Sequence, residues 1–117
     1  MPKKFIKSFS YAHAGARHAL RTQRNLWIHF CMALLALAVA AFIRVSLLEL
    51  AVLVLAIFGV IVAEMVNTAI EEMVNLLSPR ESDAAALAKN VAAAAVLLAA
   101  GGAVLVGCLI FIPRFLW

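Results

Sequence analysis

The stretch LLELAVLVLAIFGVIVAEMVNTAIEEMVNLLSP, residues 47–79, changes character halfway along. Its first half is apolar except for Glu49, whereas its second half carries three acids and two amides within about three helical turns. A carboxylate near hydrocarbon is costly, so an acid at the end of such a run must be paired, protonated or facing a polar cavity. The stretch therefore predicts a membrane-spanning helix that ends in a polar and functional face.

Apolar runs on either side of this stretch, at 26–43 and 91–112, are also long enough to span a membrane. Each can cross a hydrocarbon core of about 30 Å at about 1.5 Å per residue. The composition agrees, because 67% of the 117 residues are hydrophobic and the mean hydropathy is +1.06. We therefore expect an all-α integral membrane protein, a single domain over 1–117 whose three transmembrane segments lie in helices at 26–43, 47–77 and 84–112.

The segment 5–22 is amphipathic. Phe5, Phe9, Ala12 and Ala16 repeat at helical spacing, and a basic set accompanies them: Lys3, Lys7, Arg17, Arg21 and Arg24. Such a helix lies in the membrane interface with its apolar side toward the acyl chains. It is either an anchor or a lid over a cytoplasmic site, and the sequence favours the anchor.

The basic residues also predict the orientation. Six of them precede the first span, whereas the turn between the first two spans holds only Arg44. Under the positive-inside rule the N-terminus is cytoplasmic. The net charge of +4 beside a membrane span indicates anionic lipid headgroups as the partner and no nucleic acid.

The polar half of the 47–79 stretch places Glu64, Asn67, Glu71 and Asn75 on one helical face. Lys89 and Asn90 stand at the same boundary of the third span, and the first span offers Gln23, Asn25 and His29. Carboxylates, amides and a lysine at one depth fit a divalent metal bound with a polyphosphate. The structural alternative is an ion pair between Glu64 and Lys89, and the three histidines are interpreted as interfacial or packing residues.

The motifs EMVNTAIEEMVNLLSP (64–79) and LAKNVAAAAVLLAA (87–100) resemble the small prokaryotic diacylglycerol kinase and undecaprenol kinase family. The resemblance continues through KSFSYAHAGARHAL (7–20) and RNLWIHFCMALLA (24–36). It implies a homotrimeric lipid kinase of the bacterial inner membrane. Members transfer the γ-phosphoryl of ATP, with Mg²⁺, to a lipid hydroxyl at the cytoplasmic face.

The resemblance also implies roles for individual residues. Glu64 matches the catalytic base, with Asn67 beside it, and Glu71 matches a carboxylate that binds the metal and the nucleotide. Lys89 matches the lysine that contacts the triphosphate. Gln23 stands where the family usually has a second metal-binding glutamate at the nucleotide, and Asn75 and Asn90 stand where it usually has aspartates that support the site.

These departures, and Arg80-Glu81-Ser82 in place of an acidic-Tyr-His stretch near the nucleotide, predict weaker metal or nucleotide binding. The resemblance of Ile28-His29, Ser78-Pro79 and VAAAAVLLAA favours undecaprenol over diacylglycerol as the acceptor. Two other hypotheses remain open at this point: a catalytically weakened relative that acts as a membrane scaffold, and a small proton-coupled transporter built on Glu64.

Overall fold

The computed structural model describes residues 2–80 and 82–116, which form helices without any strand. The helices are α1 (Pro2–Thr22), α2 (Arg24–Ile43), α3 (Leu47–Leu77) and α4 (Asp83–Leu116). Three of them, α2, α3 and α4, are long and apolar enough to cross a membrane. The all-α membrane class is therefore confirmed, although α4 continues beyond the predicted end at 112, through Pro113, to Leu116.

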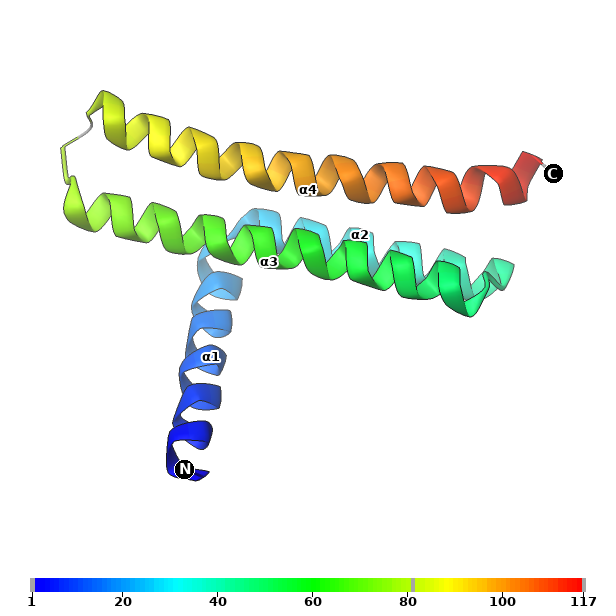
Figure 1. Ribbon diagram of the computed structural model, residues 1–117, viewed down its shortest axis with the longest axis horizontal. Coiled ribbons are helices and arrows are strands. Elements are labelled where there is room, and N and C mark those ends of the chain that lie inside the picture. The colour runs from blue at the N-terminus through cyan, green and yellow to red at the C-terminus, as the bar shows by residue number, and fades with distance from the viewer. Residues whose placement is uncertain (1, 81, 117) are drawn as a thin grey trace.

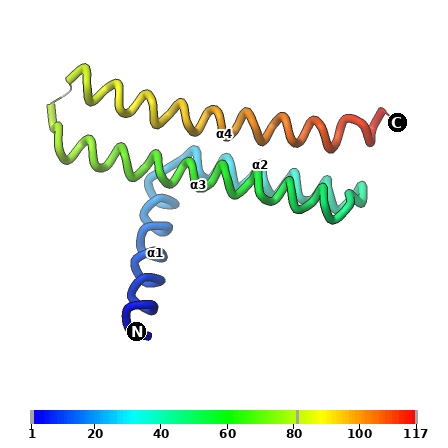
Figure 2. The backbone as a smooth tube through the Cα atoms, in the orientation of Figure 1, coloured from blue at the N-terminus to red at the C-terminus, as the bar shows by residue number. Residues whose placement is uncertain are grey.

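The three long helices run side by side, while α1 leaves the bundle and crosses its direction (Figure 1). Helices α3 and α4 form an antiparallel hairpin with the most extensive packing in the molecule, and α2 lies alongside (Figure 2). Both α3 and α4 extend past the point where α1 departs (Figure 1). A helix in the plane of a membrane has this relation to helices that cross it, which fits the anchor interpretation of α1.

The junction between α1 and α2 is a break of one residue, Gln23, whose backbone is extended. The Trp27 indole N–H donates to the Leu20 carbonyl at 2.6 Å, tying the first turn of α2 to the end of α1. Ala19 and Leu26 are buried on either side of the break. These contacts hold the direction in which α1 leaves the bundle.

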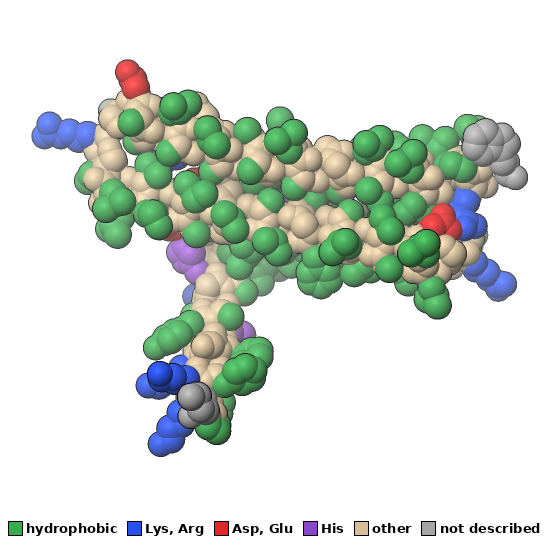
Figure 3. All heavy atoms as spheres, viewed as in Figure 1, with side chains coloured by type: hydrophobic (Ala, Val, Ile, Leu, Met, Phe, Trp, Pro, Cys, Tyr) green, Lys and Arg blue, Asp and Glu red, His purple; other side chains and the backbone are tan. Residues whose placement is uncertain are grey.

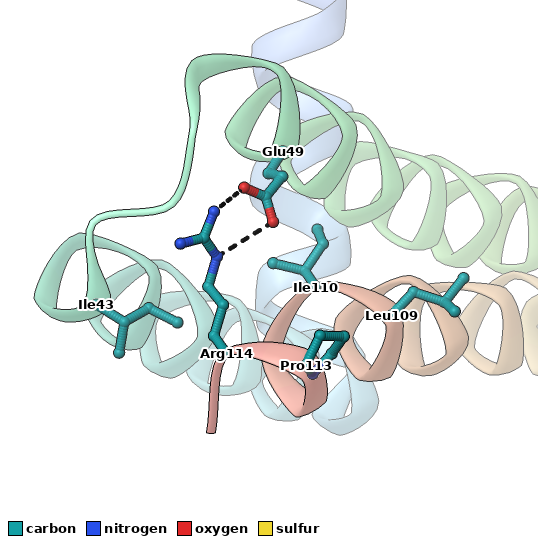
Figure 4. Close-up of a pocket in the computed structure, with 6 residues that line it drawn as sticks. All are labelled: Ile43, Glu49, Leu109, Ile110, Pro113 and Arg114. Carbon is teal, nitrogen blue, oxygen red and sulfur yellow. Dashed lines mark hydrogen bonds and ion pairs between the residues drawn. The ribbon is translucent and has the colours of Figure 1, made fainter. Parts of the chain in front are cut away.

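At the opposite end, a tight turn joins α2 to α3. Arg44 adopts the left-handed conformation with φ 56°, and its N–H bonds to the last carbonyls of α2. Ser46 then caps α3, as its sequence suggests, in a reciprocal capping box with Glu49. Figure 4 shows that the Glu49 carboxylate also pairs with the Arg114 guanidinium of α4. This ion pair links the last turn of α4, beyond Pro113, to the start of α3.

The core of the isolated chain is small, and its surface is apolar. Ala40, Leu53 and Ile110 form the buried cluster where the three long helices meet. Hydrophobic side chains cover the visible face of the bundle, while Lys and Arg side chains lie at its ends and at the free end of α1 (Figure 3). Exposure of so large an apolar surface to water would be unfavourable, so lipid or further protein must cover it.

Candidate functional site

Glu64 is the buried carboxylate of the structure, with only 3% of its surface exposed. It lies on α3 opposite the first half of α2, where His29 Nε2 is 3.0 Å from its Oε1. One turn later the Thr68 hydroxyl donates to the Glu64 carbonyl at 2.9 Å. Glu64 is thus paired, which lowers the free energy of placing a carboxylate at the end of an apolar run.

Asn67 and Glu71 form a second polar pair on the same helix. The Asn67 amide donates from Nδ2 to Glu71 Oε1 at 3.1 Å, and the Asn67 side chain is 8% exposed. Its Oδ1 is buried and has no hydrogen-bond partner in residues 2–80 and 82–116. Buried polar atoms are rarely left unsatisfied, so this oxygen is available to a partner outside the described residues.

The other predicted site residues do not join these pairs. Lys89 and Gln23 are half-buried and Asn75 and Asn90 are exposed. Within the described part of the chain, none of the four forms a side-chain hydrogen bond or ion pair with Glu64 or Glu71. The ion pair between Glu64 and Lys89 that the sequence left open is therefore not formed, because His29 takes its place. Glu81 lies outside the described residues.

Two of the histidines, which the sequence interprets as interfacial or packing residues, also pair with glutamates on another helix. His29 bonds to Glu64, and His18 of α1 bonds to the exposed Glu72 of α3, with Nε2 3.0 Å from Oε1. Sequence spacing could not find either pair, since the partners lie on different helices. Two features of the sequence could have indicated the His29–Glu64 pair. Glu64 needs a partner, and His29 stands at a similar membrane depth on the neighbouring span.

An apolar groove of about 380 Å³ lies between α2, α3 and α4 and ends at the site. Leu53, Ile57 and Phe111 are among its lining residues, and His29 is the one polar side chain lining it in the described structure. The groove therefore reaches His29, the hydrogen-bond partner of Glu64. A ligand with an apolar chain and a single polar end would match this arrangement.

The oxygen atoms of Asn67 and Glu71 suit a divalent metal that needs few protein ligands. Nowhere in residues 2–80 and 82–116 do three His, Cys, Asp or Glu side chains gather at metal-binding distance. Mg²⁺ needs fewer protein ligands, because it is usually held by one or two carboxylates, with phosphates and waters completing its octahedron. The Glu71 carboxylate beside the unpartnered Asn67 Oδ1 supplies oxygen ligands of this kind, so the residues fit Mg²⁺ bound together with a phosphate ligand.

Three helices that can span a membrane, with a buried acid bonded to a histidine that lines an apolar groove, define an integral-membrane protein with a polar site. Comparison with known proteins identifies the class further, because a model of the prokaryotic diacylglycerol kinase family matches residues 10–111. The chain belongs to this family and is a lipid kinase.

Two relatives show how far the similarity extends. The chain is 35% identical over 111 residues to the undecaprenol kinase of Bacillus subtilis, covering 95% of this chain and 90% of that protein. It is 39% identical over 112 residues to a diacylglycerol kinase of Synechocystis, covering 95% of this chain but 64% of the relative. The match to the Bacillus protein thus involves nearly the whole of both chains.

Proposed function

We propose that this protein transfers the γ-phosphoryl group of ATP to the hydroxyl of a membrane lipid alcohol, with undecaprenol as the preferred acceptor. The observation that carries the proposal is Glu64, buried and hydrogen-bonded to His29, which lines an apolar groove. A lipid that enters along the groove would bring its hydroxyl to this carboxylate. The product would be undecaprenyl phosphate.

Glu64 serves as the general base in this reaction. The acceptor oxygen attacks the γ-phosphorus while its proton passes to the carboxylate, and the bond from the γ-phosphorus to the bridging oxygen breaks to release ADP. Little covalent work falls to the protein in phosphoryl transfer, and positioning and charge dominate. A base within hydrogen-bond reach of the acceptor adds about 10²- to 10⁴-fold to the rate.

Glu71, Asn67 and Gln23 would hold Mg²⁺, whose positive charge offsets that of the triphosphate. Lys89 contacts the phosphates as a point charge, with Asn75 and Asn90 as polar supports. Asn67 Oδ1 favours this assignment, since it is a buried oxygen ready to accept. Gln23, however, supplies a neutral amide where the family pattern has a carboxylate.

The site faces the cytoplasm, with α1 lying on the inner surface of a bacterial inner membrane. Helix α3 has 31 residues and is therefore about 46 Å long, against a hydrocarbon core of about 30 Å. The stretch from Leu47 to Glu64 alone spans about 26 Å, so Glu64 falls within about 4 Å of the inner boundary of the hydrocarbon and the end of α3 emerges. The basic residues of α1 are exposed and available to anionic headgroups.

The working form is a homotrimer. Within one chain, Lys89 reaches neither Glu64 nor Glu71, and most of the apolar surface is uncovered. Three helices cannot close a polar site against lipid by themselves, so neighbouring copies would complete it. A monomer as the active species in a mild bilayer mimic would contradict this part of the proposal.

Undecaprenol is preferred because similarity to the Bacillus undecaprenol kinase extends over 90% of that protein. Ile28-His29, Ser78-Pro79 and VAAAAVLLAA support the same branch. Diacylglycerol, the acceptor in the name of the Synechocystis relative, is the alternative. A third possibility is a weakened kinase with a scaffolding role, which the neutral residues Gln23, Asn75 and Asn90 favour.

A phosphorylation assay tests the proposal. Purified protein in bilayers receives labelled ATP and Mg²⁺ with either undecaprenol or diacylglycerol, and the labelled lipid is quantified. We expect a higher kcat/KM for undecaprenol. A higher value for diacylglycerol would transfer the assignment to that lipid, and no transfer to either would reject the kinase activity of this chain. In the last case, activity restored by Gln23→Glu or Asn90→Asp would establish the weakened-kinase alternative.

A further inference from the structure

The side chain of Glu64 has one hydrogen-bond partner in the described chain, the His29 imidazole on α2. Thr68 bonds only to the Glu64 backbone carbonyl, and Asn67 is committed to Glu71. We infer that His29 is a positioning residue for phosphoryl transfer: it holds Glu64 by one carboxylate oxygen and leaves the other free for the acceptor hydroxyl. This inference rests on the proposed function.

The hydrogen bond assigns a separate role to each carboxylate oxygen of Glu64. An ionised carboxylate can only accept, so the proton of a neutral His29 must lie on Nε2, the nitrogen 3.0 Å from Glu64 Oε1. Oε1 is therefore engaged, and Oε2 remains to take the acceptor proton. Without His29, no other side chain in residues 2–80 and 82–116 would hold the rotamer of Glu64. A base must lie within hydrogen-bond reach of the proton that it removes.

His29 is placed to hold this geometry precisely. It lies two residues beyond Trp27, whose indole binds α2 to the end of α1, and three residues beyond the buried Leu26. Its side chain is 24% exposed and lines the apolar groove, whereas that of Glu64 is 3% exposed. A partner held on a rigid helix fixes a reactive group better than one on a mobile loop.

Loss of His29 should remove part of the rate enhancement that Glu64 provides as the general base. General-base catalysis contributes about 10²- to 10⁴-fold, and a misplaced base keeps some of it. We therefore expect His29→Leu to lower kcat by about 10- to 100-fold. The KM for the lipid should change by less than about threefold, because the interaction acts on the transition state.

The matched substitution is His29→Gln, whose amide can donate to Glu64 but cannot exchange a proton as imidazole does. It should restore most of the kcat that His29→Leu loses. If His29→Gln is as inactive as His29→Leu, the imidazole itself moves the proton and the positioning role is overturned. Unchanged kcat in His29→Leu would overturn it as well.

Two further arms separate this inference from its alternatives. In a Glu64→Gln background, His29→Leu should cause no further loss of kcat, since it acts only through Glu64. His18→Leu is the control, because it removes a His–Glu contact of the same 3.0 Å length outside the site and should leave kcat unchanged. Each variant is compared only as an intact oligomer of wild-type size.

A readout without turnover distinguishes failure of this inference from failure of the proposed function. Nitrogen-15 NMR of labelled histidine should show His29 as the Nε2–H tautomer, with a signal that shifts in Glu64→Gln but not in Glu72→Gln. If no lipid is phosphorylated while this signal is present, the proposed function fails but the contact stands. If the signal does not respond to Glu64→Gln, the contact and the inference are both rejected.

Discussion

Replacing Asn67 with aspartate should make the protein depend strongly on Mg²⁺. In the wild type, Asn67 Nδ2 donates to Glu71 Oε1 at 3.1 Å, so Asn67→Asp would set two carboxylates at about this separation. At an effective dielectric constant of about 20, two like unit charges 3.1 Å apart repel by about 5 kcal/mol. Either a proton or a divalent cation must relieve that repulsion.

The assay is the thermal unfolding midpoint of detergent-solubilised protein, measured against MgCl₂ concentration with EDTA as the zero point. Without Mg²⁺ the variant should unfold below the wild type, and saturating Mg²⁺ should remove most of the difference. Even a quarter of the repulsion, relieved by the cation, would strengthen Mg²⁺ binding by about tenfold. The half-maximal concentration should therefore fall by at least about that factor.

Leu76→Asp is the matched control, because it adds the same charge to the same helix at an exposed position on the side opposite Asn67. It should leave the Mg²⁺ response close to that of the wild type. If Asn67→Asp responds to Mg²⁺ no more than Leu76→Asp does, then Asn67 and Glu71 do not hold the cation. The assignment of the unpartnered Asn67 Oδ1 would then be wrong.

Three further predictions concern the site and the helix packing. Gln23→Glu should lower the Mg²⁺ concentration for half-maximal activity, because it adds a carboxylate ligand, and unchanged Mg²⁺ titrations would contradict this. It should not reduce stability, because an acid at the N-cap of α2 suits the helix dipole. Arg114→Gln should lower the unfolding midpoint, and the double variant with Glu49→Gln should unfold at the same midpoint as Arg114→Gln alone. Additive losses would show that Arg114 and Glu49 do not act as a pair. Leu53→Ala should cost about 2–5 kcal/mol of unfolding free energy in reversible unfolding, because it empties a buried position, while the same change at the exposed Leu55 should cost far less.

Much of the fold follows from patterns that act within one segment. The apolar runs predict three spanning helices because each run is as long as the hydrocarbon is thick. Ser46 before the third element predicts its cap, since a cap needs only a side chain and the backbone three residues on. The end of α4 was placed at 112 because the apolar run ends there, whereas Arg114 in the last turn pairs with Glu49, far away in sequence.

The part of the site that lies within one helix could also be predicted from the sequence. Glu64, Asn67 and Glu71 share one helix, so their spacing already places them on one face. The pairing of Glu64 with His29 instead of Lys89 depends on how α2 packs against α3, which spacing within one helix does not encode. Contacts of Lys89 and Asn90 with the phosphates stay predictions, as do the roles of Gln23 and Asn75.

The central claim is that the buried carboxylate of Glu64 is the base in lipid phosphorylation. The most direct measurement is the kcat of Glu64→Gln beside that of Glu72→Gln, with labelled ATP, Mg²⁺ and undecaprenol in bilayers. Both changes remove one carboxylate from the same helix, but Glu72 is exposed and outside the site. We predict that Glu64→Gln lowers kcat by at least about 10²-fold in an intact oligomer while Glu72→Gln stays near the wild type. Equal activity of the two variants would contradict the account.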